Sequence, residues 1–456
     1  MNNKTNKNNI TDMTVGNPTR HIILFAIPLM IGNIFQQLYN TIDSLVVGKY
    51  VGADALAAIG NCGSLNFLFF SLSSGLAIGI GIIVSQYYGA HDDTGVRNTI
   101  ANSLYILAAA SLAATLLGFV IARPILILIA TPAEVMDMAV LYLRTTVCGI
   151  LFIAIYNGVA AALRALGDSK TPLYFLIMSS LFNIAFDLLF VLKFNMGVFG
   201  VGFATVIAQF LSATISTLYA VLKVPYFKLS RKEMIPNKHI IIRSFKLGVP
   251  MSLQSSMIAI SMIVIQNVVN GFGTIVMAAY TITCKVDLIA SQIYNAISTS
   301  LVTYSGQNMG ANNINRIKKG YWRGAVIICL YNLIVIPIVV FFSPQITGFF
   351  VNDADVISVG AQALTISSPF YLALGLIYIP RGVLNGCGDA KFSLINGITE
   401  VICRIVYAHL LTRIPGIGLW GIWWATGFTW VTVAIVNNTR YWTGKWKYLK
   451  SAAATK

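Results

Sequence analysis

Charged residues are scarce in this chain of 456 residues, and acidic ones are the scarcer kind. Only 10% of the residues are Asp, Glu, Lys or Arg, and only 15 of these are acidic. An average soluble domain carries about 25% charged residues. With 57% hydrophobic residues and a mean hydropathy of +0.75, the chain has too little polar surface to cover a water-soluble globule of its size. These values predict an integral membrane protein.

Cysteine and histidine are too scattered to form the usual reactive or metal sites. The six cysteines fall almost entirely in apolar runs, and no two form a C-x-x-C pair, so we interpret them as packing residues. The histidines, His21, His91, His239 and His409, are dispersed. A Gly-Lys-Ser/Thr nucleotide-binding loop is also missing. We therefore expect no enzyme activity, no cofactor and no direct use of ATP.

Basic residues outnumber acidic ones by 31 to 15, which gives a net charge of +16. Such a charge could indicate nucleic-acid binding, but the Lys and Arg residues lie in short segments between apolar runs. This distribution is typical of loops that orient a membrane protein. We expect no nucleic-acid partner.

Long apolar runs are what the chain has in abundance. About twelve runs of roughly 20 or more residues are bounded by charged or turn-forming residues, and each is long enough to cross a bilayer as a helix. The approximate spans are 22–48, 55–85, 98–120, 136–162, 172–192, 199–222, 243–269, 275–304, 323–342, 357–379, 392–412 and 417–439. The sequence therefore predicts an all-α integral membrane protein with twelve transmembrane helices.

The segments between the spans differ in charge on the two sides. With a cytoplasmic N-terminus, about 24 Lys and Arg residues lie on the cytoplasmic side, and about four (Lys49, Arg123, Lys193 and Arg413) lie on the other. This asymmetry predicts that both termini are cytoplasmic, which requires an even number of spans. We expect a multi-pass protein of the plasma membrane.

Three motifs recur in the second half of the chain with one constant spacing of 221 residues. The pairs are GAHDDTGVRN from Gly89 and GANNINRIKK from Gly310, LRALGDSK from Leu163 and LNGCGDAK from Leu384, and GVFGVGFAT from Gly197 and GLWGIWWAT from Gly418. A repeat of six helices, an even number, predicts two lobes that cross the membrane in the same direction. We predict an N-lobe at 1–222, a basic cytoplasmic linker at 223–242, and a C-lobe at 243–456 that ends in a basic tail.

Two aspartates interrupt the apolar spans of the first half. Asp43 ends a polar stripe with the spacing of one helix face, formed with Asn33, Gln36 and Asn40. Asp187 follows polar residues in the same way. A carboxylate at mid-membrane costs roughly 2.5–3.5 kcal/mol on insertion scales, so it usually faces a watery interior and handles a cation or a proton.

The residues near these aspartates leave three interpretations open. Tyr39 lies one turn before Asp43, and Thr205 and Gln209 are four residues apart on the sixth span. Two carboxylates with amide and hydroxyl oxygens suit a small monovalent cation. The same group could hold a proton instead, because two acids in a poorly solvated pocket share protons readily. Alternatively, each acid only accepts hydrogen bonds between helices.

The second half offers a different set of charged residues. Asp287 lies on a face with several hydroxyl groups, and it either lines a cavity or pairs with a basic residue, while Lys285 points elsewhere. Glu400 and Arg404 are four residues apart, and we expect a structural ion pair between them. Two Gly-Asp turns, Gly167-Asp168 and Gly388-Asp389, are typical of turns and helix caps rather than of catalysis.

Several motifs together resemble the bacterial type of the multidrug and toxic compound extrusion (MATE) family. They are YNTIDSLVVG with LAAIG, YYGA, LRALGD, NIAFDLLF and GVFGVGFAT, and the resemblance covers nearly the whole chain. It implies a V-shaped antiporter of two six-helix lobes that exports cationic, amphipathic compounds against an inward flow of H⁺ or Na⁺. Carried over by position, the family's cation site consists of Asp43, Asn183, Asp187 and Thr205, and Tyr39 and Asn157 line the same cavity.

One departure from the family concerns the second half. Some members carry acids on the seventh and tenth helices, where this chain offers Gln254 and no carboxylate. Coupling through the C-lobe in that manner is therefore not expected. Asp287 and Glu400 are the acids that could substitute.

The function that we predict is secondary active multidrug export by alternating access, with H⁺ or Na⁺ as the coupling ion. The expected partners are cationic amphipathic small molecules and the lipid bilayer, and we expect a monomer. The side chains expected to line the substrate cavity are those of Gln36, Tyr39, Asn40, Asn157, Gln209, Gln254 and Asp287. A related lipid or lipid-linked oligosaccharide flippase is the alternative, although its cavity should be lined by Arg or Lys. Of these, only Arg144, Lys285 and Arg404 fall within the predicted helices.

Overall fold

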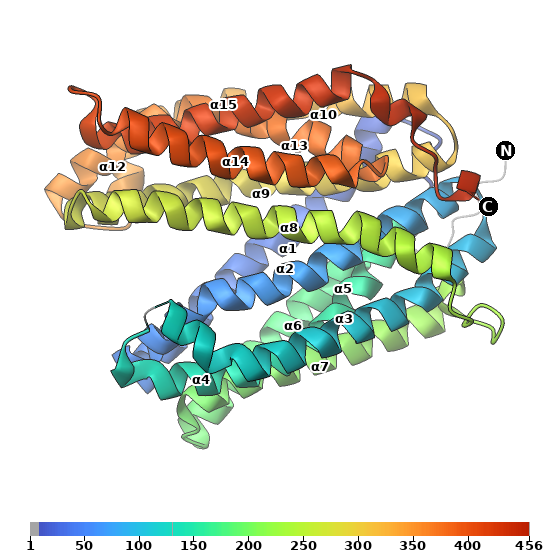
Figure 1. Cartoon of the computed structure of the whole chain (residues 1–456), viewed down its shortest axis with the longest axis horizontal. Coiled ribbons are helices and arrows are strands. Elements are labelled where there is room, and N and C mark those ends of the chain that lie inside the picture. The colour runs from blue at the N-terminus through green and yellow to red at the C-terminus, as the bar shows by residue number, and fades with distance from the viewer. Residues whose placement is uncertain (1–8, 130, 456) are drawn as a thin grey trace. The chain divides into compact units, whose positions relative to one another are not determined.

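The computed structural model describes residues 9–129 and 131–455, without the side chains of Asn40, Ser44, Ala53 and Thr455. The predicted cavity-lining side chain of Asn40 thus lies outside the described part. Every regular element in the described ranges is a helix (Figure 1). The prediction of an all-α fold is confirmed.

Eleven helical segments of the described chain are long and apolar enough to cross a membrane. They are α1 (Pro18–Val46) with η1 (Val47–Val51), α2 (Ala53–Gly89), α3 (Asp93–Leu128), α6 (Lys170–Leu188) with η2 (Leu189–Lys193), α7 (Gly197–Lys223), α8 (Lys238–Asn270), α9 (Thr274–Gly310), α10 (Ile314–Phe341), α12 (Ala354–Ser367) with η4 (Ser368–Phe370) and α13 (Tyr371–Gly386), α14 (Ala390–Leu411), and α15 (Gly421–Trp442). The twelfth is a bent pair, α4 (Ala133–Val147) and α5 (Ile150–Ala165). Twelve transmembrane helices are therefore confirmed.

The bend of 42° between α4 and α5 was not predicted, since 136–162 reads as one apolar run. At this point the backbone amides of Cys148 and Gly149 bond to carbonyls three residues back, those of Thr145 and Thr146. Such bonds tighten the last turn of a helix and change its direction. The remaining described elements are short: η3 (Pro225–Phe227), α11 (Ser343–Gly348), η5 (Gly418–Trp420), η6 (Lys445–Tyr448) and η7 (Ala453–Thr455).

The internal repeat is visible in the backbone conformation. Ten described residues between 52 and 418 have a positive φ angle, and they form five pairs that are each 221 residues apart. The pairs are Gly52 and Gly273, His91 and Asn312, Gly167 and Gly388, Asn195 and Gly416, and Gly197 and Gly418. The fourth span is also interrupted in both halves, between α4 and α5 and at η4. The predicted parallel repeat is confirmed.

Chain contacts divide the molecule into two compact units. Unit 1 holds the N-terminal segment through Met13, Ile27–Ser252 and the C-terminal segment from Ala452; unit 2 holds Thr14–Ala26 and Leu253–Ser451. Two of the four divisions fall inside a helix, in α1 beside Pro28 and in α8 beside Pro250. The assignment of 1–222 and 243–456 as functional lobes stays a prediction.

Unit 1 is packed through small residues. A methyl group added at Gly79 of α2 would lie 2.7 Å from the backbone nitrogen of Gly248 in α8, and Gly75 is as close to Ser252. Close approach at small residues is a common way for membrane helices to associate. Helix α2 also contacts α3, α4 and α5 of the same unit.

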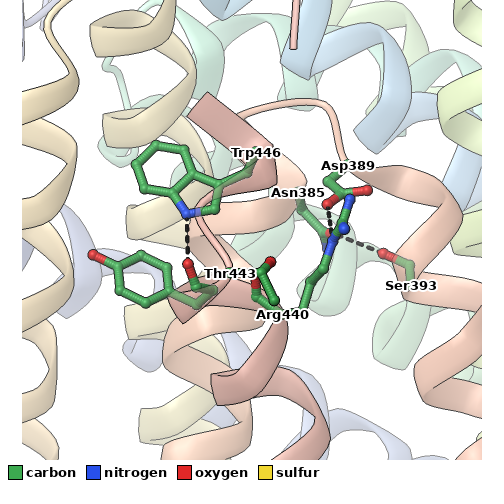
Figure 2. A network of polar contacts seen from close by, with 7 residues as sticks. Asn385, Asp389, Ser393, Arg440, Thr443 and Trp446 are labelled. Atoms are coloured by element: carbon green, nitrogen blue, oxygen red, sulfur yellow. Dashed lines mark hydrogen bonds and ion pairs between the residues drawn. The ribbon is translucent and has the colours of Figure 1, made fainter. Parts of the chain in front are cut away.

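In unit 2 the second Gly-Asp turn is tied to α15. The Asp389 carboxylate accepts a hydrogen bond of 2.8 Å from Nε of Arg440, beside a bond of 2.5 Å from Ser393 to Asn385 (Figure 2). The first turn behaves differently, because Asp168 accepts from the backbone N–H groups of Lys170 and Thr171 at the start of α6. The predicted helix cap is confirmed for Asp168 and wrong for Asp389, whose carboxylate forms an ion pair instead.

Candidate functional site

The two aspartates of the first half occupy matching places in their helices. Asp43 lies in the last turn of α1, directly before the π-helix η1, and Asp187 lies in the last turn of α6, directly before the π-helix η2. The two π-helices contact each other. Single turns of π-helix are rare and are found often at functional sites.

The carboxyl groups of Asp43 and Asp187 lie close enough to act on each other electrostatically. Asp187 is 0% exposed, and neither of its oxygens has a hydrogen-bond partner in the described chain. Oδ1 of Asp43 is buried without a partner as well. Buried carboxylates normally have donors or countercharges, because their desolvation is costly. A proton or a small cation between the two groups would offset this cost.

Asn183 and Thr205 extend the group of oxygens. Asn183 lies one turn before Asp187, and its Nδ2 donates a hydrogen bond of 3.4 Å to Oγ1 of Thr205. The Thr205 hydroxyl donates in turn to the Val201 carbonyl, 3.1 Å away. Oδ1 of Asn183 is buried without a partner, so it is free to accept or to ligate. The structure thus brings together the four residues predicted for the cation site.

Two tyrosines lie within electrostatic range of both carboxyl groups. One is Tyr39, as predicted from its position one turn before Asp43. The other is Tyr142 of α4, which is buried and was not predicted. It stands in an apolar run without a polar stripe, so the sequence carries no periodic signal for it. Each tyrosine carries a hydroxyl group, which is a potential hydrogen-bond donor to a carboxylate that has no bound cation.

A cavity of about 190 Å³ opens beside these residues within unit 1. Its lining includes the predicted side chains of Gln36, Tyr39, Asn157, Asn183, Thr205 and Gln209. Asp43 and Asp187 are not among the lining residues, although Tyr39 and Asn183, one turn away from them, are. Gln254 and Asp287, also predicted to line a cavity, belong to unit 2 and are not part of this lining.

Sixteen of the lining residues were not predicted, among them Tyr156, Arg164, Ser169 and Ser212. Arg164 was counted among the basic residues of a loop, but it lies in the last turn of α5. The spacing of seven residues from Asn157 to Arg164 places both on one face of that helix, which is the signal that could have identified it. The hydroxyl groups of Tyr156 and Ser212 have no comparable pattern.

Asp287 and Glu400, the two acids of unit 2 that the sequence singled out, each have a partner. Oδ1 of Asp287 accepts a hydrogen bond of 2.6 Å from the hydroxyl of Tyr371, and Glu400 and Arg404 form the predicted ion pair at 3.3 Å. Arg404 also acts electrostatically on Asp287. Gln254 is buried against Gly397, and its Nε2 has no partner in the described chain. Asp287 is thus held by a tyrosine, near but not bonded to a basic residue.

The chemistry of the Asp43–Asp187 group is that of hard oxygen donors. The described residues contain no group of three or more His, Cys, Asp or Glu side chains that could hold a metal ion. Two carboxyl groups, an amide oxygen and a hydroxyl suit H⁺ or Na⁺ rather than a transition metal. A cation bound by these groups would be a transported ion rather than a permanently bound metal.

Comparisons with known proteins agree with this architecture. The family model MatE matches the chain twice, over residues 28–189 and 250–410, once in each half. The probable multidrug resistance protein YpnP of Bacillus subtilis is 28% identical over 441 residues, which cover 96% of this chain and 98% of the relative. The multidrug export protein MepA of Staphylococcus saprophyticus is 22% identical and covers 88% of both chains.

Solved structures share the fold at low sequence identity. A MOP superfamily transporter from Pyrococcus furiosus superposes with a TM-score of 0.89 at 23% identity, over 98% of this chain and 99% of the other. An outward-facing multidrug resistance MATE transporter gives a TM-score of 0.88 at 22% identity, over 99% and 100% of the two chains. These likenesses confirm the twelve-helix fold.

Proposed function

Because this chain belongs to the MatE family, as its motifs predicted, we propose that it is a secondary active exporter driven by H⁺ or Na⁺ binding at Asp43 and Asp187. The observation that carries the proposal is that two neighbouring carboxyl groups have buried oxygens without any hydrogen-bond donor in the described chain. A structural pair of helix-linking acids would have such donors, as Asp287 does. A transferable cation would satisfy these oxygens and could also leave them.

The geometry suggests how occupancy of the site acts on the helices. Asp43 belongs to α1 and Asp187 to α6, so a cation between them holds these two helices together. When it leaves, two like charges in a poorly solvated site repel each other, and the contact is no longer stable. Cation binding therefore biases α1 and α6 between two arrangements, which is what alternating access requires. One charge that crosses 100 mV supplies about 2.3 kcal/mol for this change.

We further propose that the exported compounds are amphipathic organic ions, since the relatives compared above are named for multidrug resistance or export. The cavity of unit 1 offers amide, hydroxyl and aromatic side chains to such compounds. Transport by one chain, with both termini in the cytoplasm, is part of the proposal. The relatives do not favour the flippase alternative.

Transport in proteoliposomes tests the site. A pH gradient and a sodium gradient are imposed in separate experiments, and we expect one of them to drive the uptake of ethidium. The effective gradient identifies the coupling ion. Asp43→Asn and Asp187→Asn should each lower gradient-driven uptake by at least about tenfold, because neither variant can hold and release the ion. Asp137→Asn, which removes an exposed carboxylate, is the matched control. Normal uptake in both site variants would refute the assignment.

A further inference from the structure

Among the described residues that line the cavity of unit 1, Arg164 is the single charged one, and it is a cation. Arg164 stands among apolar, amide, hydroxyl and aromatic side chains. Its guanidinium has no ion-pair or hydrogen-bond partner in the described chain. Such a group disfavours the binding of organic cations that carry no anionic group, because like charges repel in a poorly solvated space.

Arg164 and the aspartates lie toward opposite ends of this cavity. Tyr156, two turns before Arg164 on α5, donates a hydrogen bond of 3.3 Å to the carbonyl of Pro172 at the start of α6. The lining continues along α6 to Asn183, eleven residues and about 16 Å further. Asp187 is one more turn beyond Asn183. The space is therefore polarised along α6, with a positive group near its start and carboxyl groups past its other end.

Unsatisfied polar atoms line the space between these ends. Ser212 and Asn183 are 2% and 3% exposed, and Oγ of Ser212 and Oδ1 of Asn183 have no partner among the described residues. Nδ2 of Asn157, on the same helix face as Arg164, is an unpartnered donor. Buried polar groups are rarely left without partners, because the cost is considerable. A polar ligand in the cavity would satisfy them.

We propose that this cavity binds zwitterionic amphipathic molecules, with their anionic group, such as a carboxylate, at Arg164. Guanidinium and carboxylate form short, charge-assisted and often bidentate hydrogen bonds. Asn157, with its unpartnered donor, lies on the same helix face, while Asn183 and Gln209, whose side-chain oxygens have no partner in the described chain, line the cavity as well and would serve the cationic part of the molecule. This inference rests on the proposed export function and narrows its substrate class.

A matched pair of dyes separates the anionic group from the rest of the ligand. Rhodamine 110 carries a free carboxylate, and rhodamine 123 is its methyl ester with a net positive charge. Their Kd values are measured by fluorescence polarisation on the purified full-length protein in detergent, without any gradient. We expect wild-type protein to bind rhodamine 110 more tightly. Arg164→Gln should raise the Kd of rhodamine 110 by about tenfold or more and change that of rhodamine 123 by less than about twofold.

Two further variants keep the test decisive. Arg164→Lys retains the charge, so it should keep a preference for rhodamine 110 even if the neutral variant does not fold. Lys170→Gln removes an exposed basic residue at the start of α6 that does not line the cavity, and it should alter neither Kd. Arg164 also lies in the last turn of α5, where a positive charge stabilises the helix end. A purely structural role would weaken the binding of both dyes equally.

The outcomes are distinct from those of the export test. Equal changes for both dyes, no change in Arg164→Gln, or wild-type protein that binds neither dye or prefers the ester would each overturn the inference. A failure of export itself would show as absent gradient-driven uptake of rhodamine 123 in proteoliposomes. That result would leave the comparison of Kd values, and hence the ligand class of the cavity, to be judged separately.

Discussion

Three aspartates within the membrane-spanning helices differ in how their oxygen atoms are satisfied. Both oxygens of Asp187 and Oδ1 of Asp43 have no hydrogen-bond partner in the described chain, whereas Asp287 accepts a short hydrogen bond from Tyr371. A carboxylate with a protein donor is held in place by that donor. We therefore propose that Asp287 serves the stability of unit 2 and that the other two serve ion handling.

Removal of the Tyr371 hydroxyl tests this division. Tyr371→Phe leaves Asp287 buried without its donor, so we expect a loss of about 1–3 kcal/mol in the free energy of unfolding. The measurement is the Tm of the purified protein in detergent. Tyr448→Phe, at an exposed position, is the control and should leave Tm unchanged. An unaltered Tm in Tyr371→Phe would contradict the structural assignment of Asp287.

At the level of single residues, the sequence identified the groups whose presence in a membrane is costly. Asp43 and Asp187 stand out because a carboxylate in a membrane-spanning run is costly and is usually present for a function. Tyr142 and Ser212 could not be found in this way, because a hydroxyl group on an apolar run costs little and follows no period. Arg164 was misplaced because basic residues near span ends are also expected from the orientation of the chain.

The linker between the halves is an element whose nature the sequence did not reveal. It was expected to be a solvated loop, yet it is docked on α3. Tyr226 donates to Asp93 at 3.1 Å, and the backbone N–H of Asn237 donates to Asn102 at 2.8 Å. Composition gave the charge of this segment correctly, but the contacts depend on side chains far away in sequence.

Acid should loosen this docking. The N–H of Ser230 donates to Glu233 at 2.6 Å and Arg97 lies 3.6 Å away, and these two groups lower the pKa of the Glu233 carboxyl. A carboxyl whose folded-state pKa lies below its unfolded value of about 4.3 contributes stability above that pH, and loses it as the pH falls through the folded-state pKa. We expect the rate at which an acid protease cleaves the linker to rise across this window.

Glu233→Gln is the variant that checks the assignment. It cannot ionise, so its linker should be cleaved faster than that of wild type at the upper end of the protease's pH range, and this difference should disappear as the pH falls. Glu134→Gln, at an exposed carboxylate on α4, should behave as wild type. A variant that keeps the wild-type pH profile would show that another group controls the linker.

Helix positions were predictable from apolar length, whereas their irregularities were not. Most span ends were placed within five residues, because bilayer thickness sets the length of each run, but the span 98–120 was predicted to end eight residues before Leu128 and the span 323–342 to begin nine residues after Ile314. The break at Cys148 and Gly149 and the π-helices η1 and η2 were missed. Such features depend on whether a backbone amide bonds to the carbonyl three, four or five residues back. The hydrophobicity of the sequence does not distinguish these hydrogen-bond patterns.

For the whole molecule, the repeat made the architecture predictable. One register of 221 residues links the motifs, the positive-φ positions and the interrupted fourth spans. Within unit 1, both terminal segments are tied to helix ends: the N–H of Thr11 donates to Leu166, and that of Ala452 to Gln86. Conformational changes during transport are determined by no local sequence pattern, so the sequence could not predict them.

The orientation of the termini remains to be measured with reporter fusions. Green fluorescent protein fused to either end should fluoresce, because both ends are predicted to be cytoplasmic. Alkaline phosphatase should be inactive at the same two places, and active when inserted in the short loops near Lys193 or Arg413. A reporter that places the two termini on opposite sides would require an odd number of spans and would contradict the topology.

The π-helices η1 and η2 hold one residue more per turn than the α-helices that precede them. If such a wide turn slides past the neighbouring aspartate, the helix segment between its old and new positions rotates about its own axis by about 100°, the angle of one residue. Asp43 and Asp187 each adjoin a wide turn. Their carboxyl groups can therefore swing apart by a twist of short helical segments, while the surrounding bundle stays in place and no helix has to unfold.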